Sequence, residues 1–170
     1  MWAEAYLEQA RSDWLMCQLI RKQKLPGCHA LHYLQMTCEK LGKAFLIAGK
    51  SISPDQAKGS HIAFKRFLQV ASRHPELRSL LAMTSSQFKA HIKQLLPLAE
   101  NIERLAPALA QDGPNAEYPW ESPERKIHVP VSYDFAVLQE LHRPPGVNLL
   151  KIVDLVQSQF YRLFTKPHHA

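Results

Sequence analysis

The stretch that decides the fold runs from His32 to Arg66. It reads HYLQMTCEKLGKAFLIAG, then KSISPDQAKGSH, then IAFKR. In the first part, apolar residues recur every three or four positions, which is the period of one face of an α-helix. We expect Gly49 to end this helix, because glycine accepts the left-handed backbone conformation that often closes one. The stretch therefore predicts a long amphipathic helix, a polar loop at 49–60 and a histidine, His61, opening the next helix.

The same period continues on both sides of this stretch. Ser60 is the expected N-cap of the helix that follows the loop. Pro97 lies inside a long helix that starts after a capping box at Thr84–Gln87, so we expect a kink or a break there, with a second disturbance at Pro107. Further helices are predicted at these ranges: 2–22, 28–48, 61–73, 76–82, 134–141 and 148–164.

These elements predict an all-α fold, an up-and-down helical bundle of four to five main helices. We expect one domain over 1–170, with core helices at 1–110 and a C-terminal helix at 147–165. Six of the 12 prolines lie between these parts, at 111–146. That segment is too rich in aromatic and β-branched residues for a disordered tail. It is expected to pack irregularly across the bundle, with a short extended piece at 126–131.

Charge and cysteine content narrow the functional classes. The net charge of +6 comes from 21 Lys and Arg against 15 Asp and Glu. This balance suits an RNA, nucleotide or acidic-protein partner, although an unspecialised basic surface gives the same number. Three cysteines without a CxxC pair favour reduced thiols and a cytoplasmic location. We expect neither a secretory signal nor a membrane-spanning segment.

The loop and its flanking helices contain most of the residues that could bind a ligand or catalyse a reaction. Histidine titrates near neutral pH, and a helix N-terminus attracts phosphate. Together with lysines, such a histidine suits phosphate binding or phosphodiester cleavage. The alternative is that the lysines solvate a loop while the histidine caps or packs its helix. His61 is the candidate catalytic residue, and the candidate nucleotide- or RNA-binding residues are Lys43, Lys58, His61, Lys65 and Arg66.

The chain resembles the HEPN (higher eukaryote and prokaryote nucleotide-binding) domain family. The run EKLGKAFL at 39–46 is similar to the EKxxKAxL pattern of the family's second helix, and His61 follows it after a loop. Ala10 and Asp13 match the A-x-x-D pattern of the first helix. Glu117-Tyr-Pro-Trp120 resembles the family's RYP-like segment. The resemblance spans roughly 3–120 and implies a helical bundle, commonly a homodimer, in prokaryotic defence or toxin–antitoxin systems with an antitoxin-like partner.

Many members of this family are metal-independent ribonucleases that carry Arg, four to six further residues and then His. This chain departs from that pattern. Only lysines precede His61 at short range, and Arg66 lies too far from His74. Arg162 and His168 have the spacing but lie beside Pro167 at the chain end, which favours coincidence. We therefore expect nucleotide or RNA binding, with a non-catalytic dimerisation or protein-interaction module as the alternative and a ribonuclease as the second alternative.

Other patterns indicate no further chemistry. Cys28 and His32 share a helix face, but no second ligand pair has zinc spacing, so no metal or other cofactor is expected. The six glycines form no phosphate-binding loop. Tyr118, Trp120 and Tyr133 lie near Arg125 and Lys126, a combination that can stack bases. We favour the other interpretation, in which these aromatic residues anchor the irregular segment to the bundle.

Overall fold

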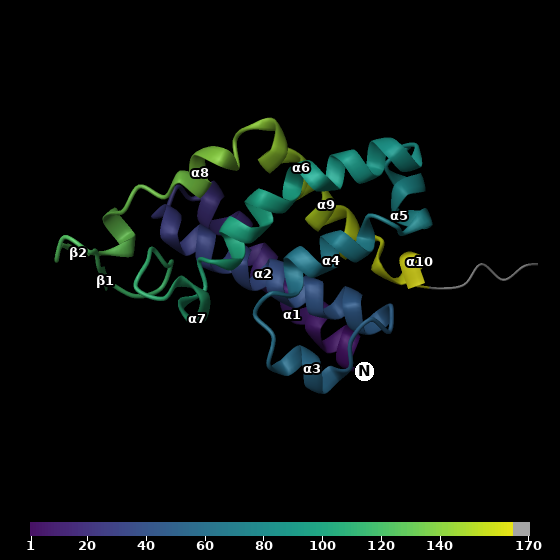
Figure 1. Cartoon of the computed structure of the whole chain (residues 1–170), viewed down its shortest axis with the longest axis horizontal. Helices are drawn as coiled ribbons and strands as arrows, with labels where there is room; N and C mark the ends of the chain where they lie inside the picture. The colour runs from purple at the N-terminus through teal and green to yellow at the C-terminus, as the bar shows by residue number, and fades with distance from the viewer. Residues whose placement is uncertain (165–170) are drawn as a thin grey trace, which may run out of the picture.

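The computed structural model describes residues 1–164, and these form an all-α helical bundle, which confirms the predicted fold class (Figure 1). Within them, the helices of nine or more residues are α1 (Trp2–Lys22), α2 (Gly27–Ala48), α4 (Ala63–Ala71), α6 (Ser85–Glu103) and α9 (Pro144–Ser158). The shorter elements are α3 (Pro54–Lys58), α5 (Pro75–Leu80), α7 (Pro107–Ala110), β1 (Trp120–Glu121), β2 (Ile127–His128), the 3-10 helix η1 (Pro130–Ser132), α8 (Ala136–Glu140) and α10 (Phe160–Phe164).

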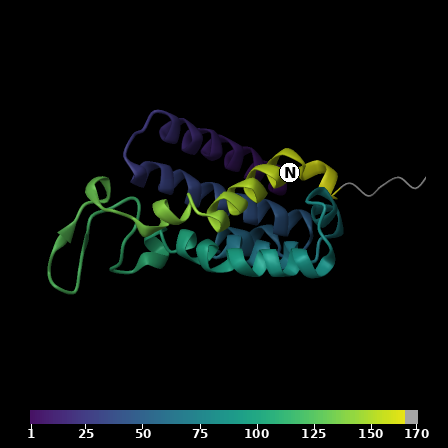
Figure 2. The ribbon, with the colours of Figure 1, turned by 90° about the horizontal axis from the view of Figure 1, so that it is seen from above.

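The central element is α2, which packs against α1, α4, α6 and α9. Figure 2 shows α1 on the outside of the bundle, with α2 between it and the α4–α6 pair. Phe45 of α2 lies edge-to-face with Phe67 of α4, with 4.7 Å between ring centroids. Because α2 is covered on several sides, its sequence is apolar around most of its circumference. Its polar residues are therefore unusually informative about function.

Gly42 determines how closely α4 approaches α2. A Cβ atom placed on this residue would lie 2.6 Å from the carbonyl oxygen of Ala63, the first residue of α4. A real side chain would force the two backbones apart. The glycine thus brings the start of α4, and with it His61, against the middle of α2.

The loop predicted at 49–60 contains a helix, so this prediction is wrong in part. Ser53 and Gln56 form a capping box, and Pro54 occupies the first turn of α3, where its missing N–H costs nothing. The helix α2 does end at Gly49, but Gly49 is not left-handed. Lys50 takes that conformation instead, with φ at 55°.

The proline-containing helices differ from expectation in two places. The helix α6 continues through Pro97 without a break and ends at Glu103. The predicted helix at 148–164 begins earlier, at Pro144, and is divided at Gln159 into α9 and α10. Pro144 and Pro145 were assigned to the irregular segment, but proline is well tolerated in the first turn of a helix.

Residues 111–135, here called the arm, project from one end of the bundle (Figures 1 and 2). Their two short strands pair antiparallel, with Trp120 opposite His128, and the second lies within the extended piece predicted at 126–131. Trp120 is 8% exposed and lies edge-to-face with Tyr133 at 4.8 Å. These rings form a small core within the arm. The expectation that this segment packs across the bundle is wrong, since the arm projects from one end of it.

The cysteines are structural. Cys17, Cys28 and Cys38 are free and buried, and burial raises the pKa of Cys17 to about 11. A thiol with so high a pKa is unreactive near neutral pH. None of the helices in 1–164 has the length and apolar character needed to cross a membrane.

Candidate functional site

The predicted cationic residues do not converge on one site. Lys43 is 5% exposed and forms an ion pair with Glu39, with 2.6 Å between Nζ and Oε1. Its ammonium also lies 5.6 Å from the centre of the Tyr6 ring. The paired glutamate neutralises the charge of such a buried lysine, so the lysine attracts a ligand only weakly. Lys43 therefore stabilises the fold and does not contribute to an open binding surface.

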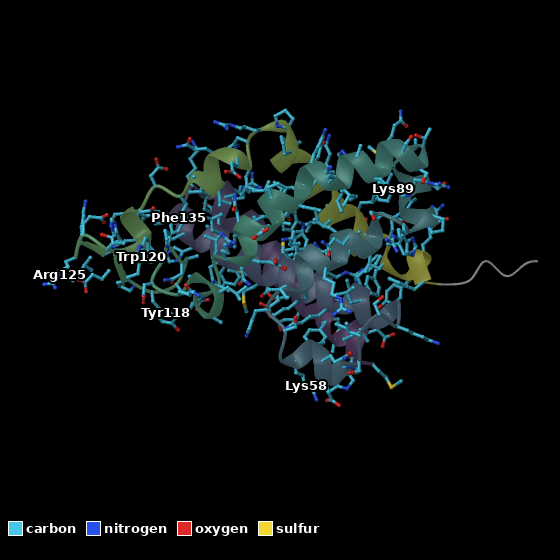
Figure 3. The ribbon with its side chains drawn as sticks, viewed as in Figure 1. Lys58, Lys89, Tyr118, Trp120, Arg125 and Phe135 are labelled. Atoms are coloured by element: carbon cyan, nitrogen blue, oxygen red, sulfur yellow. The ribbon has the colours of Figure 1, made fainter. Side chains whose placement is uncertain are left out.

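Lys58 lies at the outer edge of the molecule on α3 (Figure 3). Its Nζ atom is 2.9 Å from Asp55 Oδ1 and 4.7 Å from the centre of the Trp2 ring. These contacts hold the short helix α3 against the start of α1. The side chain remains half exposed, so it is a solvated cation with a local structural role.

His61 lies before α4 and not within it. The helix begins at Ala63 with Ile62 as its N-cap, so the predicted start at His61 and the cap at Ser60 are both wrong. His61 and Lys65 consequently do not share a helix face. The imidazole is about half exposed, and its Nδ1 atom lies 3.4 Å from Glu39 Oε2.

A carboxylate from a distant helix closes the N-terminus of α4. Glu103 Oε1 accepts hydrogen bonds from the backbone N–H groups of Phe64 and Lys65, each at 2.9 Å. Glu103 is 4% exposed, and this burial raises its pKa above the usual value. The helix N-terminus that we expected to attract phosphate is thus already occupied by a buried carboxyl group of the protein itself.

We call Gln35, Glu39, Lys43 and His61 the Glu39 network. Gln35 donates to Glu39 Oε2 at 3.1 Å, so the carboxylate contacts all three of the other side chains. Burial on its own would raise the pKa of Glu39, but the hydrogen bond and charge of Lys43 lower it overall. The network therefore holds an ionised carboxylate inside α2, with the histidine at its exposed edge.

A second ion pair lies one helical position away on α2. Lys40 Nζ is 2.5 Å from Asp13 Oδ2, and Gln9 donates to Asp13 Oδ1 at 3.1 Å. Asp13, Glu39, Lys43 and His61 all belong to the patterns that carry the family resemblance. Our sequence reasoning had assigned no site role to Asp13 or Glu39. The signal was present in EKLGKAFL, where two charges four residues apart interrupt an apolar helix face.

Lys65 and Arg66 border a pocket between α4 and α6, here called the α4–α6 pocket. Its volume is about 530 Å³. Lys65 and Arg104 both bind Glu100, at 2.6 and 2.9 Å, and Arg66 donates to the backbone oxygen of Ser51 at 3.2 Å. The side chains that line the pocket are Ile62, Lys65, Arg66, Gln69, Glu100, Glu103, Arg104 and Leu109.

The pocket has a cationic surplus. Three cationic side chains face two carboxylates, and Glu103 already accepts two backbone hydrogen bonds. Lys65, by its hydrogen bond and its charge, and then Arg104 lower the pKa of Glu100, so this acid is ionised near neutral pH. Arg104 was missed by sequence reasoning because it looks like an ordinary exposed partner for Glu100 four residues earlier.

The arginine–histidine pairs considered for ribonuclease activity do not form a site. Arg66 points to Ser51, whereas His74 accepts a hydrogen bond from the N–H of Leu77 and packs on Phe45. Burial lowers the pKa of His74. Arg162 binds Glu76 Oε1 at 2.8 Å, and His168 lies outside the described residues.

The arm contacts α2 through a histidine and an acid. His32 Nδ1 lies 3.3 Å from Glu117 Oε1. On the arm itself, Tyr118 is 60% exposed and Arg125 lies at the turn between the two strands, while Trp120 and Phe135 are buried (Figure 3). The aromatic–basic patch is therefore divided between buried rings, Trp120 and Phe135, and the exposed side chains of Tyr118 and Arg125.

Within residues 1–164, no three His, Cys, Asp or Glu side chains are arranged to hold a metal ion. Comparison of the chain with protein-family models, with curated proteins and with solved structures finds no match. Function must therefore be inferred from the chain's own residues.

Proposed function

We propose that this chain is a HEPN-like helical domain that binds a nucleotide or a short stretch of RNA at the α4–α6 pocket. The observation that carries this proposal is the placement of Lys65, Arg66 and Arg104 around one pocket of about 530 Å³. Small-molecule sites commonly enclose roughly 300–1,000 Å³. The cations suit phosphate groups, and the lining also includes two apolar side chains, Ile62 and Leu109, which suit a base.

The charges of the pocket indicate modest, salt-sensitive binding. A phosphate has to compete with Glu100 for Lys65 and Arg104, whereas Arg66 donates to the uncharged backbone oxygen of Ser51. Arginine is well suited to this role because its planar guanidinium can hold phosphate through two hydrogen bonds. If three cations contact RNA, log K should fall with log salt at a slope of about −2.

The Glu39 network supports the HEPN-like part of the proposal. Asp13, Glu39 and Lys43 are charged residues held inside an apolar bundle, where burying a charge costs free energy unless it is paired. Asp13 pairs with Lys40, and Glu39 contacts Lys43 and His61, so two groups of residues from the family patterns are in contact. A role in a prokaryotic defence or toxin–antitoxin system, with an antitoxin-like partner, rests on the resemblance alone and is part of the proposal.

Titration of ATP, GTP and a short labelled RNA at low salt tests this function. We expect at least one of the three to bind with Kd below about 1 mM, and Arg104→Ala to weaken it by about tenfold. Lys93→Ala is the matched control, since it removes an exposed cation from α6, the helix that Arg104 caps, outside the pocket. Failure of all three ligands to bind, or equal loss in both variants, overturns the proposal.

Ribonuclease activity is a separate alternative, because its candidate residue, His61, does not line the α4–α6 pocket. The Nδ1 side of His61 faces Glu39, and the imidazole is about half exposed. A histidine oriented by a carboxylate suits a general base, although the chain lacks the family's arginine. Cleavage of labelled RNA that persists in EDTA and disappears in His61→Ala would establish this activity. No cleavage, or cleavage that His61→Ala retains, rejects His61 as its catalytic residue.

A second candidate function is a non-catalytic protein-interaction module. The observation that favours it is the exposed apolar surface of the arm, where Ile127 is 70% and Val131 56% exposed. Light scattering over a concentration series tests self-docking through this surface. Association that the Ile127→Ser and Val131→Ser double variant removes would support the arm, and association that this variant leaves unchanged would count against it.

A further inference from the structure

The outward face of α1 carries exposed leucines between two opposite charges. Glu8, Ser12, Leu15, Leu19 and Lys22 follow one another at spacings of four, three, four and three residues, and all five are exposed. Leu15 is 65% and Leu19 45% exposed. The opposite face of the same helix is buried against α2. Figure 2 shows the helix at the outside of the bundle.

This spacing is the one that makes helices pack side by side. Residues four and three apart form a continuous seam along a helix, and an apolar seam is the part that a second helix covers. The seam on α1 is apolar at its centre, with Met16 beside it at 36% exposure. A contiguous exposed apolar patch indicates an interaction site more strongly than single exposed apolar residues do.

The charges at the two ends of the seam define what fits it. Glu8 lies toward the start of the helix and Lys22 at its end, and within residues 1–164 neither has an ion-pair partner. A second copy placed antiparallel about Leu15 brings Glu8 of each copy opposite Lys22 of the other. The same placement brings Leu15 opposite itself and Ser12 within one residue of the position opposite Leu19. A parallel placement would bring like charges together, so the charges select the antiparallel one.

We propose that this face of α1 is a self-association surface, on which a second copy of the chain packs α1 against α1 in antiparallel orientation about a two-fold axis. Such an interface is isologous, since the same residues contribute from both copies. The inference does not rest on the proposed nucleotide binding. The two can therefore fail separately, because the α1 seam shares no residue with the α4–α6 pocket.

Sedimentation over a wide range of protein concentration tests the surface. We expect a monomer–dimer equilibrium that Leu15→Glu weakens by about a hundredfold or more, since it places two like charges at the centre of the interface. Val70→Glu on α4 is the control, because it introduces the same charge at an apolar residue that is 36% exposed and belongs neither to the α1 seam nor to the arm. Circular dichroism checks that each variant is folded. A wild-type monomer up to about 1 mM overturns the proposal, as does loss of the dimer in Val70→Glu alone.

Charge reversal tests the orientation. Glu8→Lys and Lys22→Glu should each weaken self-association, because each places like charges opposite one another in the antiparallel pair. A mixture of the two single variants should associate, since every opposing pair in the mixed dimer is again opposite in charge. The double variant should recover association as well. If the mixture associates no better than either variant on its own, the antiparallel arrangement is wrong.

Discussion

The Glu39 network and the α4–α6 pocket are built from the same kinds of side chain, yet they differ in how their charges are matched. In the network, Lys43 and Glu39 are both largely buried and satisfy each other. In the pocket, Glu100 is shared by Lys65 and Arg104, and Arg66 donates to an uncharged carbonyl oxygen. The first region stabilises the fold, and the second retains cationic groups that a ligand can bind.

This difference shows why a count of nearby lysines is a weak guide to a phosphate site. Lys43 and Lys65 lie on adjacent helices and each pairs with a glutamate at 2.6 Å. Only the surroundings separate them, since one faces the core and the other an open pocket. Burial and the local balance of charge therefore decide which cation is available.

The largest effect that we expect is on stability, from Lys43→Ala. This change leaves the Glu39 carboxylate buried without its main partner, which should lower the free energy of unfolding by about 3 kcal/mol. Urea denaturation followed by circular dichroism measures it. Lys58→Ala is the control, because an exposed ion pair contributes less than about 1 kcal/mol. Equal losses in the two variants would remove the distinction between buried and open cations.

A somewhat smaller loss is expected from Gly42→Ala. The added methyl group would collide with the backbone of Ala63, and overpacking of this kind costs about 1–3 kcal/mol. Gly59→Ala is the matched control, since a Cβ there meets no atom within 4 Å. Should the two glycine variants unfold at the same urea concentration, the close approach of α4 to α2 would not depend on Gly42.

The two buried glutamates should affect the pH dependence of stability in opposite directions. The folded-state pKa of Glu39 is lowered, so its contribution is present above the usual carboxyl pKa and is lost as the pH falls through its folded value. The folded-state pKa of Glu103 is raised, so its contribution is full below the usual pKa and is lost as the pH rises through its folded value.

Urea denaturation at several pH values from about 3 to 7 measures these contributions. Stability should rise with pH less steeply in Glu39→Gln than in the wild type, and more steeply in Glu103→Gln. If the plots of stability against pH for both variants run parallel to that of the wild type, neither acid titrates as its surroundings indicate.

Sequence periodicity was sufficient for the two longest helices and insufficient for α3 and for the start of α4. The long helices α1 and α2 follow from apolar residues three and four apart. The start of α4 could not be predicted because its cap, Glu103, comes from another helix 39 residues away from Phe64. Ser60 looked like a cap only because local rules consider neighbours along the chain.

The candidate site was likewise predicted in part. Lys65 and Arg66 are at the pocket, whereas Lys43, Lys58 and His61 lie elsewhere. The chain's own pattern gave no reason to bring Arg104 beside Lys65, because that contact depends on how α6 crosses α4. Local charge patterns indicate which residues are cationic, and packing decides which of them share a surface.

Amide chemical-shift mapping during an ATP titration tests the central claim most directly, since it asks which of the two regions receives the ligand. We predict shifts concentrated on Ile62, Arg66, Gln69 and Leu109 around the α4–α6 pocket, with little change at Gln35 and Glu39. Shifts centred on Glu39 and His61 would place the ligand at the Glu39 network, and shifts at neither region would show that ATP does not bind; either result would contradict the account.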